Sequence, residues 1–432
     1  MLLHQVKLPH FKHSAESETV KLPMPDKVVI SMAQHLGAPC TPTVKIGDKV
    51  KIGDVIGSSE AAMSAPVHSS ISGTVTAITD VLHISGRNMQ SVVIENDGLE
   101  QISDSVCPPT VENREQFLQA VRNSGSIGLG GAGFPTSLKL GFDPKEKQPD
   151  FLIINGAECE PYITSDYRCF MEEGEDVLEG VLLMLKYLGI PKCIIGIEKN
   201  KPKAIEKMTR LCEKHDNITV KPLKSSYPQG AEKTLIFSTT GRVVKEGTLP
   251  LASGCIVINS STAAFIAQYI RTGMPLVKRR ITVDGNIVKK PSNFIVPVGM
   301  SIGEIVYYAE LSDKPDRIIL GGPMMGACAF DPDYPLSKTN NAVLMFADSP
   351  VYEPSECIRC GKCVKACSMN LLPTELEHAF DMRDAMRLEK LKVNLCVNCG
   401  ACSFVCPAKR NLAEKNQLAK AFLRDQSTRK GK

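Results

Sequence analysis

Two cysteine-rich runs near the C-terminus constrain this chain more than any other feature. One extends from Cys357 to Cys367 and the other from Cys396 to Cys406, and both have the spacing C-x-x-C-x-x-C-x-x-x-C. Three thiolates at this spacing can hold one face of a [4Fe–4S] cluster, and the fourth cysteine of such a run usually ligates a second cluster. The spacing therefore predicts two [4Fe–4S] clusters.

This exchange of the fourth cysteine divides the predicted ligands into two sets. The first set is Cys357, Cys360, Cys363 and Cys406, and the second is Cys396, Cys399, Cys402 and Cys367. Pro407 follows the last cysteine, as in bacterial two-cluster ferredoxins, whereas Ser368 stands where those have proline. A zinc ribbon is the alternative, but zinc takes four ligands and would leave the third cysteine of each run unused. We therefore expect a ferredoxin-like α-helical domain over residues 349–412.

The composition is that of a soluble protein with several domains. The chain has 432 residues, of which 43% are hydrophobic and 23% charged, and this length suggests about three domains. The N-terminus lacks the apolar core of a signal peptide. Leu251–Ile270 is a run of twenty residues without a charge and could be a membrane span, but Asn259 and Ser260 lie near its middle. We expect a buried strand followed by a helix capped by Ser or Thr there, in a cytoplasmic protein.

Charge is concentrated at the C-terminus. The formal net charge is +4, yet residues 408–432 hold eight Lys or Arg against Glu414 and Asp425. We expect a basic tail over residues 413–432, which either solvates a helix end or docks on an anionic membrane face or an acidic partner. Aromatic residues are 5% and Trp is absent, so nucleic-acid stacking surfaces are not indicated.

Residues 1–26 are polar and contain several prolines, which predicts an extended lead-in. In residues 27–105, apolar and polar residues alternate and Gly-Asp steps separate them, which is typical of short strands joined by tight turns. The pattern resembles the barrel-sandwich fold of biotinyl and lipoyl carriers. The hairpin that carries the modified lysine in those proteins corresponds to Ser59–Ser64, which contains no Lys. We expect the fold without the carrier function.

Residues 106–275 alternate between strand and helix patterns, which predicts a covered parallel sheet. Phe151–Ile154 reads as a buried strand, and an amide and two carboxylates follow it, Asn155, Glu158 and Glu160. The carboxyl ends of parallel strands are where α/β folds place their ligands.

A glycine-rich loop, residues 125–136, precedes this strand. Gly128, Gly130 and Gly133 match G-x-G-x-x-G, but the dinucleotide fingerprint should follow a strand, and here a helical segment comes first. Backbone N–H groups without side chains could still approach a phosphate or a planar cofactor. The alternative is a sharp turn between two elements.

These motifs carry a family resemblance. The glycine loop with Lys139, followed by Asn155-x-x-Glu-x-Glu-Pro161, resembles the flavin- and NADH-binding subunit of respiratory complex I. Over nearly its full length the chain is similar to the C subunits of Rnf (Rsx) electron-transport complexes, including Gly321–Gly326. Residues 276–348 resemble that family's β-grasp module, called SLBB. The fold class implied is α/β multidomain, with a barrel-sandwich module, a complex I flavoprotein-like (Rossmann-like) domain, the SLBB module and the cluster domain.

The resemblance also implies a cofactor site that binds FMN and NAD(H). Its predicted catalytic residues are Glu158 and Glu232. Its predicted cofactor-binding residues are Gly128, Gly130, Gly131, Gly133, Lys139, Asn155, Glu158, Gly230, Glu232, Asn259 and Thr262. Two positions depart from the complex I pattern, because Ala157 replaces an Asp and Ile258 replaces the first of two Asn residues.

The family implies electron exchange between NAD(H) and ferredoxin, coupled by membrane partners to Na⁺ or H⁺ transport. FMN and two [4Fe–4S] clusters would be the cofactors, and the chain would lie on the cytoplasmic face of the membrane. Partners would be the other proteins of the complex and a ferredoxin-like carrier, with no nucleic acid. The alternatives are a cobalamin reductase of the propanediol microcompartment type and a non-enzymatic iron–sulfur relay on a degenerate flavin fold.

Overall fold

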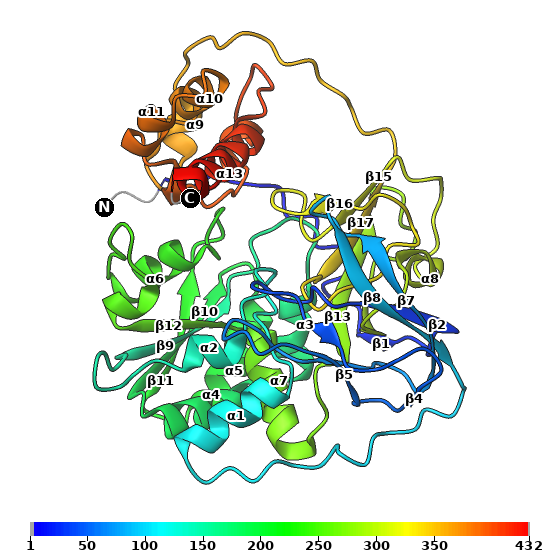
Figure 1. Cartoon of the computed structure of the whole chain (residues 1–432). Helices are drawn as coiled ribbons and strands as arrows, with labels where there is room; N and C mark the ends of the chain where they lie inside the picture. Colours follow the sequence, from blue (N-terminus) through cyan, green and yellow to red (C-terminus); the bar gives the residue numbers. More distant parts are fainter. Residues whose placement is uncertain (1–3, 431–432) are drawn as a thin grey trace.

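The computed structural model describes residues 4–430, with side chains described as far as Gln426. In this part of the chain the strands form four sheets, and a helical unit follows them at the C-terminal end (Figure 1). The predicted lead-in is extended, and parts of it pair with strands and loops of later units. Its Val20 and Lys21 form β1, which pairs with β14 of a later sheet, and Val6 bridges Tyr227.

The first two sheets make the barrel-sandwich unit. Its strands are β2 (Lys27–Ser31), β3 (Thr41–Pro42), β4 (Lys49–Val50), β5 (Val55–Ser58), β6 (Val67–His68), β7 (Gly73–Leu82) and β8 (Asn88–Asn96). They are arranged as β2-β8-β7-β4 and β3-β5-β6. Alternate side chains such as Val28, Ile30 and Val92 are fully buried between the sheets, as the sequence alternation predicts.

The α/β unit is built on a parallel sheet of order β11-β10-β9-β12. Its strands are β9 (Phe151–Gly156), β10 (Lys192–Glu198), β11 (Ile218–Leu223) and β12 (Cys255–Asn259). Its helices are α1 (Arg114–Asn123), α2 (Thr136–Leu140), α3 (Ser165–Glu172), α4 (Gly174–Leu188), α5 (Pro202–Cys212), α6 (Glu232–Thr240) and α7 (Ser260–Thr272), with the 3-10 turn η1 (Pro250–Ser253).

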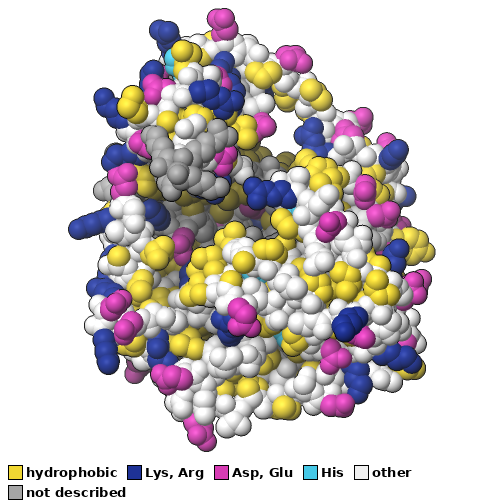
Figure 2. Space-filling view, in the orientation of Figure 1, with side chains coloured by type: hydrophobic (Ala, Val, Ile, Leu, Met, Phe, Trp, Pro, Cys, Tyr) yellow, Lys and Arg dark blue, Asp and Glu magenta, His cyan; other side chains and the backbone are white. Residues whose placement is uncertain are grey.

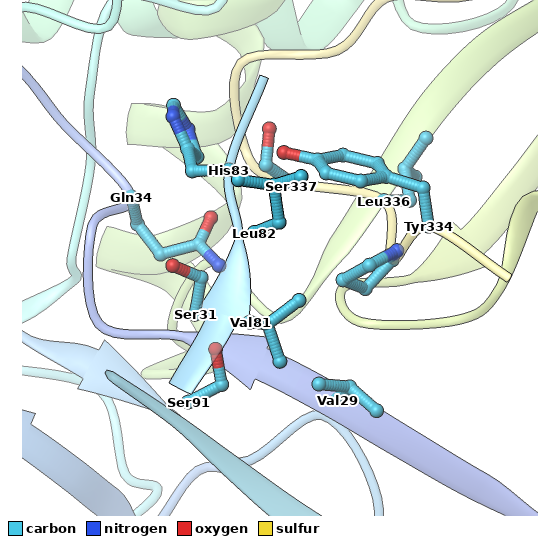
Figure 3. Close-up of a pocket in the computed structure, with 11 residues that line it drawn as sticks. Val29, Ser31, Gln34, Val81, Leu82, His83, Ser91, Tyr334, Leu336 and Ser337 are labelled. Carbon is cyan, nitrogen blue, oxygen red and sulfur yellow. The ribbon is translucent and has the colours of Figure 1, made fainter. Parts of the chain in front are cut away.

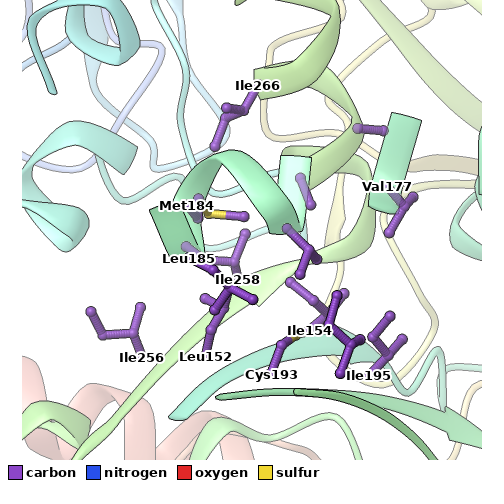
Figure 4. Close-up of a cluster of buried hydrophobic side chains, with 14 of the residues drawn as sticks. Leu152, Ile154, Val177, Met184, Leu185, Cys193, Ile195, Ile256, Ile258 and Ile266 are labelled. Atoms are coloured by element: carbon purple, nitrogen blue, oxygen red, sulfur yellow. The ribbon is translucent and has the colours of Figure 1, made fainter. Parts of the chain in front are cut away.

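Helices cover both faces of this sheet, as strand–helix alternation requires. On one face Leu152 and Ile154 of β9 pack against Met184 of α4 and Ile266 of α7 (Figure 4). On the other, Ile153 and Val257 pack against Leu235 of α6. The uncharged run from Leu251 forms η1, β12 and most of α7, so the strand-and-helix prediction is confirmed. No helix in residues 4–430 is long and apolar enough to cross a membrane.

A mixed six-stranded sheet follows, in the order β1-β14-β13-β17-β15-β16. Its remaining elements are β13 (Lys278–Gly285), β14 (Ser292–Pro297), α8 (Ile302–Tyr307), β15 (Arg317–Leu320), β16 (Ala327–Cys328) and β17 (Ala342–Phe346). Its core contains Ile281, Val283 and Val343, all fully buried. β1 comes from the lead-in, so this unit is completed by residues that precede the barrel-sandwich.

The C-terminal helices form the cluster unit. They are α9 (Lys362–Ala366), α10 (Pro373–Asp381), α11 (Ala385–Lys390), η2 (Val393–Leu395), α12 (Ala401–Phe404) and α13 (Leu412–Lys430). Figure 2 shows this unit as a lobe standing above the rest of the molecule. The segment predicted as a basic tail lies in α13, which buries Ala419 and Leu423 in one core with Leu376 of α10. Residues 413–426 are thus part of the cluster unit and not a separate tail, whereas Gly431 and Lys432 lie outside the described residues.

Candidate functional site

The carboxyl ends of β9 and β12 meet at one edge of the parallel sheet. Asn155 at the end of β9 is paired with Asn259 at the end of β12. The side-chain amide of Asn155 donates to the carbonyl of Gly230 at 3.0 Å and accepts from the N–H of Ala157 at 3.1 Å. A Cβ on Gly230 would lie 2.4 Å from the carbonyl oxygen of Ala157, so this approach requires glycine.

The glycine loop lies between α1 and α2 and is closed on itself. Gly128 N–H donates to Phe134 O at 2.8 Å, and Gly133 N–H donates to Gly128 O at 3.2 Å. Gly131 has φ +106° and Gly133 φ +64°, conformations that L side chains rarely adopt. In the described structure the N–H groups of residues 130–132 make no hydrogen bond, and these residues are exposed. Three free donors at an exposed turn are available to an anion.

The loop rests on the N-terminal end of α7. Leu129 N–H donates to Oγ1 of Thr262 at 3.0 Å, and a Cβ on Gly130 would lie 3.4 Å from Nδ2 of Asn259. Asn259 is also the helix cap, because its Oδ1 accepts from the N–H groups of Ser261 and Thr262. Its Nδ2 donates to the carboxylate of Asp166 at 2.8 Å. Asn259 therefore caps α7 and lines the loop.

A charged pair joins the helices that follow the loop and Gly230. Nζ of Lys139 on α2 lies 2.7 Å from Oε1 of Glu232, the first residue of α6, and both side chains are partly exposed. The structure thus links most of the predicted cofactor residues into one group. Its contacts connect the glycine loop to Asn259 and Thr262, Asn259 to Asn155, and Asn155 to Gly230. The Lys139–Glu232 pair adjoins them along the chain, because Glu232 is two residues after Gly230.

Glu158 is joined to this group through Asp166, which also contacts Asn259. Its Oε1 accepts from Asp166 N–H at 2.7 Å, and its Oε2 is 4.0 Å from Nζ of Lys12. Burial raises the pKa of this carboxyl to about 7, although Lys12 opposes the shift. Glu158 lines a cavity of about 280 Å³ with Lys12 and Lys201. Its predicted catalytic role at the flavin stays a prediction.

Lys12 is a residue that the sequence patterns missed. Its ammonium donates to the carbonyls of Glu158 at 3.0 Å and Glu160 at 2.8 Å, and also to that of Ile163. Burial lowers its pKa to about 8. Lys12 thus holds the loop that follows β9, but it lies in a polar lead-in without any motif that would have indicated this.

Glu160 and Tyr227 connect the α/β unit to the cluster unit. The Tyr227 hydroxyl is 2.6 Å from Cys399 O and 3.4 Å from Oε1 of Glu160. The other oxygen of Glu160 accepts from Met324 N–H at 3.0 Å. Burial raises the pKa of Glu160 to about 7. A Cβ on Gly400 would lie 2.7 Å from Met324 O, so the loop of the second cysteine run is tightly packed here.

The second predicted cysteine set is assembled in one place. Cys367, Cys396, Cys399 and Cys402 all line the same small cavity. Burial raises the pKa of Cys402 to about 12, and the three other thiols of the set add to the shift. In the first set, burial raises the pKa of Cys363, with smaller contributions from Cys406 and Cys357. Cys357 and Cys360 are exposed.

The cysteine loops suit clusters better than a single ion. N–H groups of Arg359, Leu371 and Asn398 donate to the sulfurs of Cys357, Cys367 and Cys396 at 3.3–3.4 Å. Such bonds stabilise thiolates and tune cluster potentials. Within residues 4–430, no three His, Cys, Asp or Glu side chains converge so that they could hold one metal ion. The amide donors to cysteine sulfur and the gathering of Cys367, Cys396, Cys399 and Cys402 around one cavity fit a [4Fe–4S] cluster.

Three family models match parts of the chain. The RnfC barrel sandwich hybrid domain matches residues 3–99, the Nuo51 FMN-binding domain residues 121–268, and the 4Fe-4S dicluster domain residues 356–410. These matches agree with the barrel-sandwich unit, the α/β unit and the cluster unit of the structure.

Curated relatives match most of the chain. The C subunit of the Na(+)-translocating ferredoxin:NAD(+) oxidoreductase complex of Acetobacterium woodii is 41% identical, over 82% of this chain and 81% of the relative. The proton-translocating counterpart of Clostridium ljungdahlii is 39% identical, over 89% and 85%. The C subunit of the ion-translocating oxidoreductase complex of Rhodobacter capsulatus is 35% identical, over 89% and 76%. Among solved structures, an NAD+-reducing [NiFe]-hydrogenase chain matches with a TM-score of 0.52 and 20% identity, over 72% of this chain and 63% of that one, which shows a shared fold.

Proposed function

This chain belongs to the family of C subunits of ion-translocating ferredoxin:NAD⁺ oxidoreductase complexes, and from that premise we propose that it passes electrons between NAD(H), FMN and two [4Fe–4S] clusters. The flavin, when bound, accepts hydride from NADH and returns single electrons, which a cluster can take. The protein has to bind and orient these groups and keep them close together.

The linked group at the sheet edge supports the flavin part of this proposal. The free N–H groups of residues 130–132 would bind the FMN phosphate, and Asn155 with Gly230 would border the ring. The two predicted catalytic carboxylates are Glu232, which pairs with Lys139, and Glu158, which accepts from Asp166 N–H. Glu232 would orient the nicotinamide. Glu158, together with Lys12, would fix the loop that follows β9.

The contact between Tyr227 and Cys399 is the observation that carries the proposal. It places the second cysteine set directly against the α/β unit, at the edge where Gly230 N–H donates to the sulfur of Cys159 at 3.4 Å. We infer that the cluster of Cys367, Cys396, Cys399 and Cys402 receives electrons from the flavin side. The set that contains the exposed Cys357 and Cys360 would exchange them with a partner.

The proposal extends to the surroundings of the chain. We propose a peripheral position on the cytoplasmic face of the membrane, contact with the other proteins of the complex, and exchange with a ferredoxin-like carrier. We also propose that residues 276–348 form the SLBB β-grasp module, with β1 as an added edge strand. We propose that residues 106–275, the boundaries expected from the sequence, form a Rossmann-like domain.

Anaerobic purification tests the proposal directly. We expect about eight iron atoms and one FMN per chain, and a visible spectrum that NADH bleaches in both its flavin and its cluster regions. If the protein holds flavin and iron but NADH leaves both spectra unchanged, the proposal is wrong.

A further inference from the structure

Two buried basic side chains contact carbonyl groups of the glycine loop. Lys338, between β16 and β17, is 1% exposed, and Arg279 of β13 is 4% exposed. In the described structure neither makes an ion pair, and both donate to backbone carbonyls. Burial lowers the pKa of Lys338 to about 7 and that of Arg279 to about 10, which reflects the cost of holding either charge there without a paired anion.

Lys338 lies where three units of the molecule meet. Its ammonium donates to Gly125 O of the glycine loop at 2.9 Å and to Pro66 O of the barrel-sandwich unit at 3.0 Å. Its backbone N–H donates to Oε1 of Gln34 at 2.8 Å. Figure 3 shows the neighbouring pocket, which Gln34 of the barrel-sandwich unit and Ser337 of the six-stranded unit both line. A Cβ on Gly125 would lie 2.7 Å from the ammonium, so the contact depends on glycine at this position.

Arg279 holds the next part of the loop. Its Nη2 donates to Leu129 O at 3.0 Å, and its Nε donates to Asn340 O at 3.3 Å. Asp166 is the carboxylate whose charge acts on Arg279, but its oxygens accept from Asn259 and Ser261. Arg279 thus ties the glycine loop to the segment that contains Lys338.

Three carbonyl groups of the loop therefore accept hydrogen bonds from the rest of the protein. Gly125 O, Leu129 O and Gly133 O accept from Lys338, Arg279 and the N–H of Leu36 respectively. The N–H groups of residues 130–132, between the last two of these anchors, are left without partners and exposed in the described structure. The Leu129 carbonyl and the Gly130 N–H belong to one trans peptide and point opposite ways, so the bond from Arg279 turns the Gly130 N–H away from the interior. Arg279 and protonated Lys338 add positive potential from the low-dielectric side.

We propose that Lys338 and Arg279 are positioning residues of the flavin site, which present the loop amides and make the site select a flavin that carries a phosphate. This inference rests on the proposed function, because it names what the flavin site recognises. The two residues come from the six-stranded unit and not from the flavin-binding fold, so the site is incomplete without that unit.

The test compares FMN with riboflavin, which has the same ring and no phosphate. Both are titrated by fluorescence into the flavin-depleted, full-length protein. The unaltered protein should bind FMN more tightly than riboflavin. When binding is measured below the pKa of Lys338 of about 7, Lys338→Met should weaken FMN binding about tenfold, the size expected for one buried charge near the site, and leave riboflavin binding unchanged. Lys338→Arg, which keeps the charge, should retain most of the preference for FMN.

Lys221→Met is the matched control. Lys221 is a partly buried lysine of β11 whose ammonium also donates to a backbone carbonyl, that of Thr239, at 2.8 Å. This variant should bind both flavins normally. Equal weakening of both flavins in Lys338→Met would show a merely structural role, and no change in either would show no role; both results overturn the inference.

A second measurement needs no variant. Inorganic phosphate should displace FMN from the unaltered protein without displacing riboflavin, and if it displaces both or neither the phosphate subsite is refuted. Arg279→Gln gives an independent substitution if Lys338→Met does not fold, and it should also lower FMN affinity selectively. If the unaltered protein binds neither flavin, the proposed function itself fails. If it binds both flavins equally, only the present inference fails.

Discussion

Replacing Gly131 by Val tests whether the glycine loop binds a cofactor or only turns the chain. Gly131 has φ +106° and is exposed, and a Cβ placed on it would meet nothing within 4 Å. The substitution therefore costs backbone strain of about 1–3 kcal/mol without a steric clash inside the protein. The new side chain would however stand among the free N–H groups of residues 130–132. If two hydrogen bonds to a charged phosphate are lost, the cost is about 3–6 kcal/mol, or more than about a hundredfold in affinity.

Gly47→Val is the control for this strain. Gly47 lies in the turn before β4 of the barrel-sandwich unit, has φ +94°, and also offers open space to a Cβ. Both variants should lose a similar free energy of unfolding in urea, and both should keep their iron. Only Gly131→Val should lose FMN in a fluorescence titration and NADH turnover with an artificial acceptor. If Gly131→Val retains stoichiometric FMN and normal turnover, the loop is only a turn. If Gly47→Val also loses FMN, the loss of FMN in Gly131→Val is explained by backbone strain and not by a binding role of the loop.

Three further predictions follow from the cluster unit and its contact with the α/β unit. Cys406→Ala should disturb the cluster of Cys357, Cys360 and Cys363 and lower the iron content from about eight atoms toward four; tightly bound zinc in its place would contradict the ligand assignment. Tyr227→Phe removes the donor to Cys399 O and should cost about 1–3 kcal/mol at this contact, so rapid mixing with NADH should show normal flavin reduction and slowed cluster reduction. The pKa of Glu160 is raised from 4.5 to about 7, so the folded state binds its proton more tightly and the stability that this proton contributes is lost as the pH rises from about 4.5 to 7. Glu160→Gln should flatten that part of the stability profile, and an unchanged profile would show that Glu160 is not its source.

Features set by local sequence were predictable. The cysteine spacing predicted two sets of thiols, and the structure gathers Cys367, Cys396, Cys399 and Cys402 around one cavity. The alternation of strands with helices predicted the parallel sheet, and the uncharged run predicted a capped helix after β12, although the cap is Asn259 and not the expected Ser or Thr. In each case the signal lies within a few residues of the feature, because chain geometry alone links them.

The residues that hold the site from outside the flavin-binding fold could not be predicted in this way. Lys12, Arg279 and Lys338 act through backbone carbonyls, and a carbonyl is present at every residue, so no residue pattern marks its partner. They reach the site only after distant units have packed together. Glu158 shows the same limit, because its motif position does not indicate that Lys12 of the lead-in would lie 4.0 Å from its carboxylate. Motif spacing predicts the position of a residue in the chain, but packing decides which partners its side chain contacts.

The position of α13 changes how its basic character has to be tested. Lys409 lies over the ring of Tyr352, Arg410 and Lys415 pair with Glu377, and Lys420 donates to Cys396 O at 2.9 Å. These charges stabilise the cluster unit, and Leu423 belongs to its core. Deleting the chain from Asn411 onward would therefore disrupt the second cysteine set along with any docking function, and lost activity would not separate the two. Replacing Arg429, Lys430 and Lys432 by Gln removes basic charge from residues whose side chains lie outside the described ones. If these charges dock the protein on an anionic membrane face, the triple variant should bind less to vesicles with anionic lipid and keep its iron content and NADH oxidation. Unchanged binding would leave the basic residues of α13 with only their role within the cluster unit.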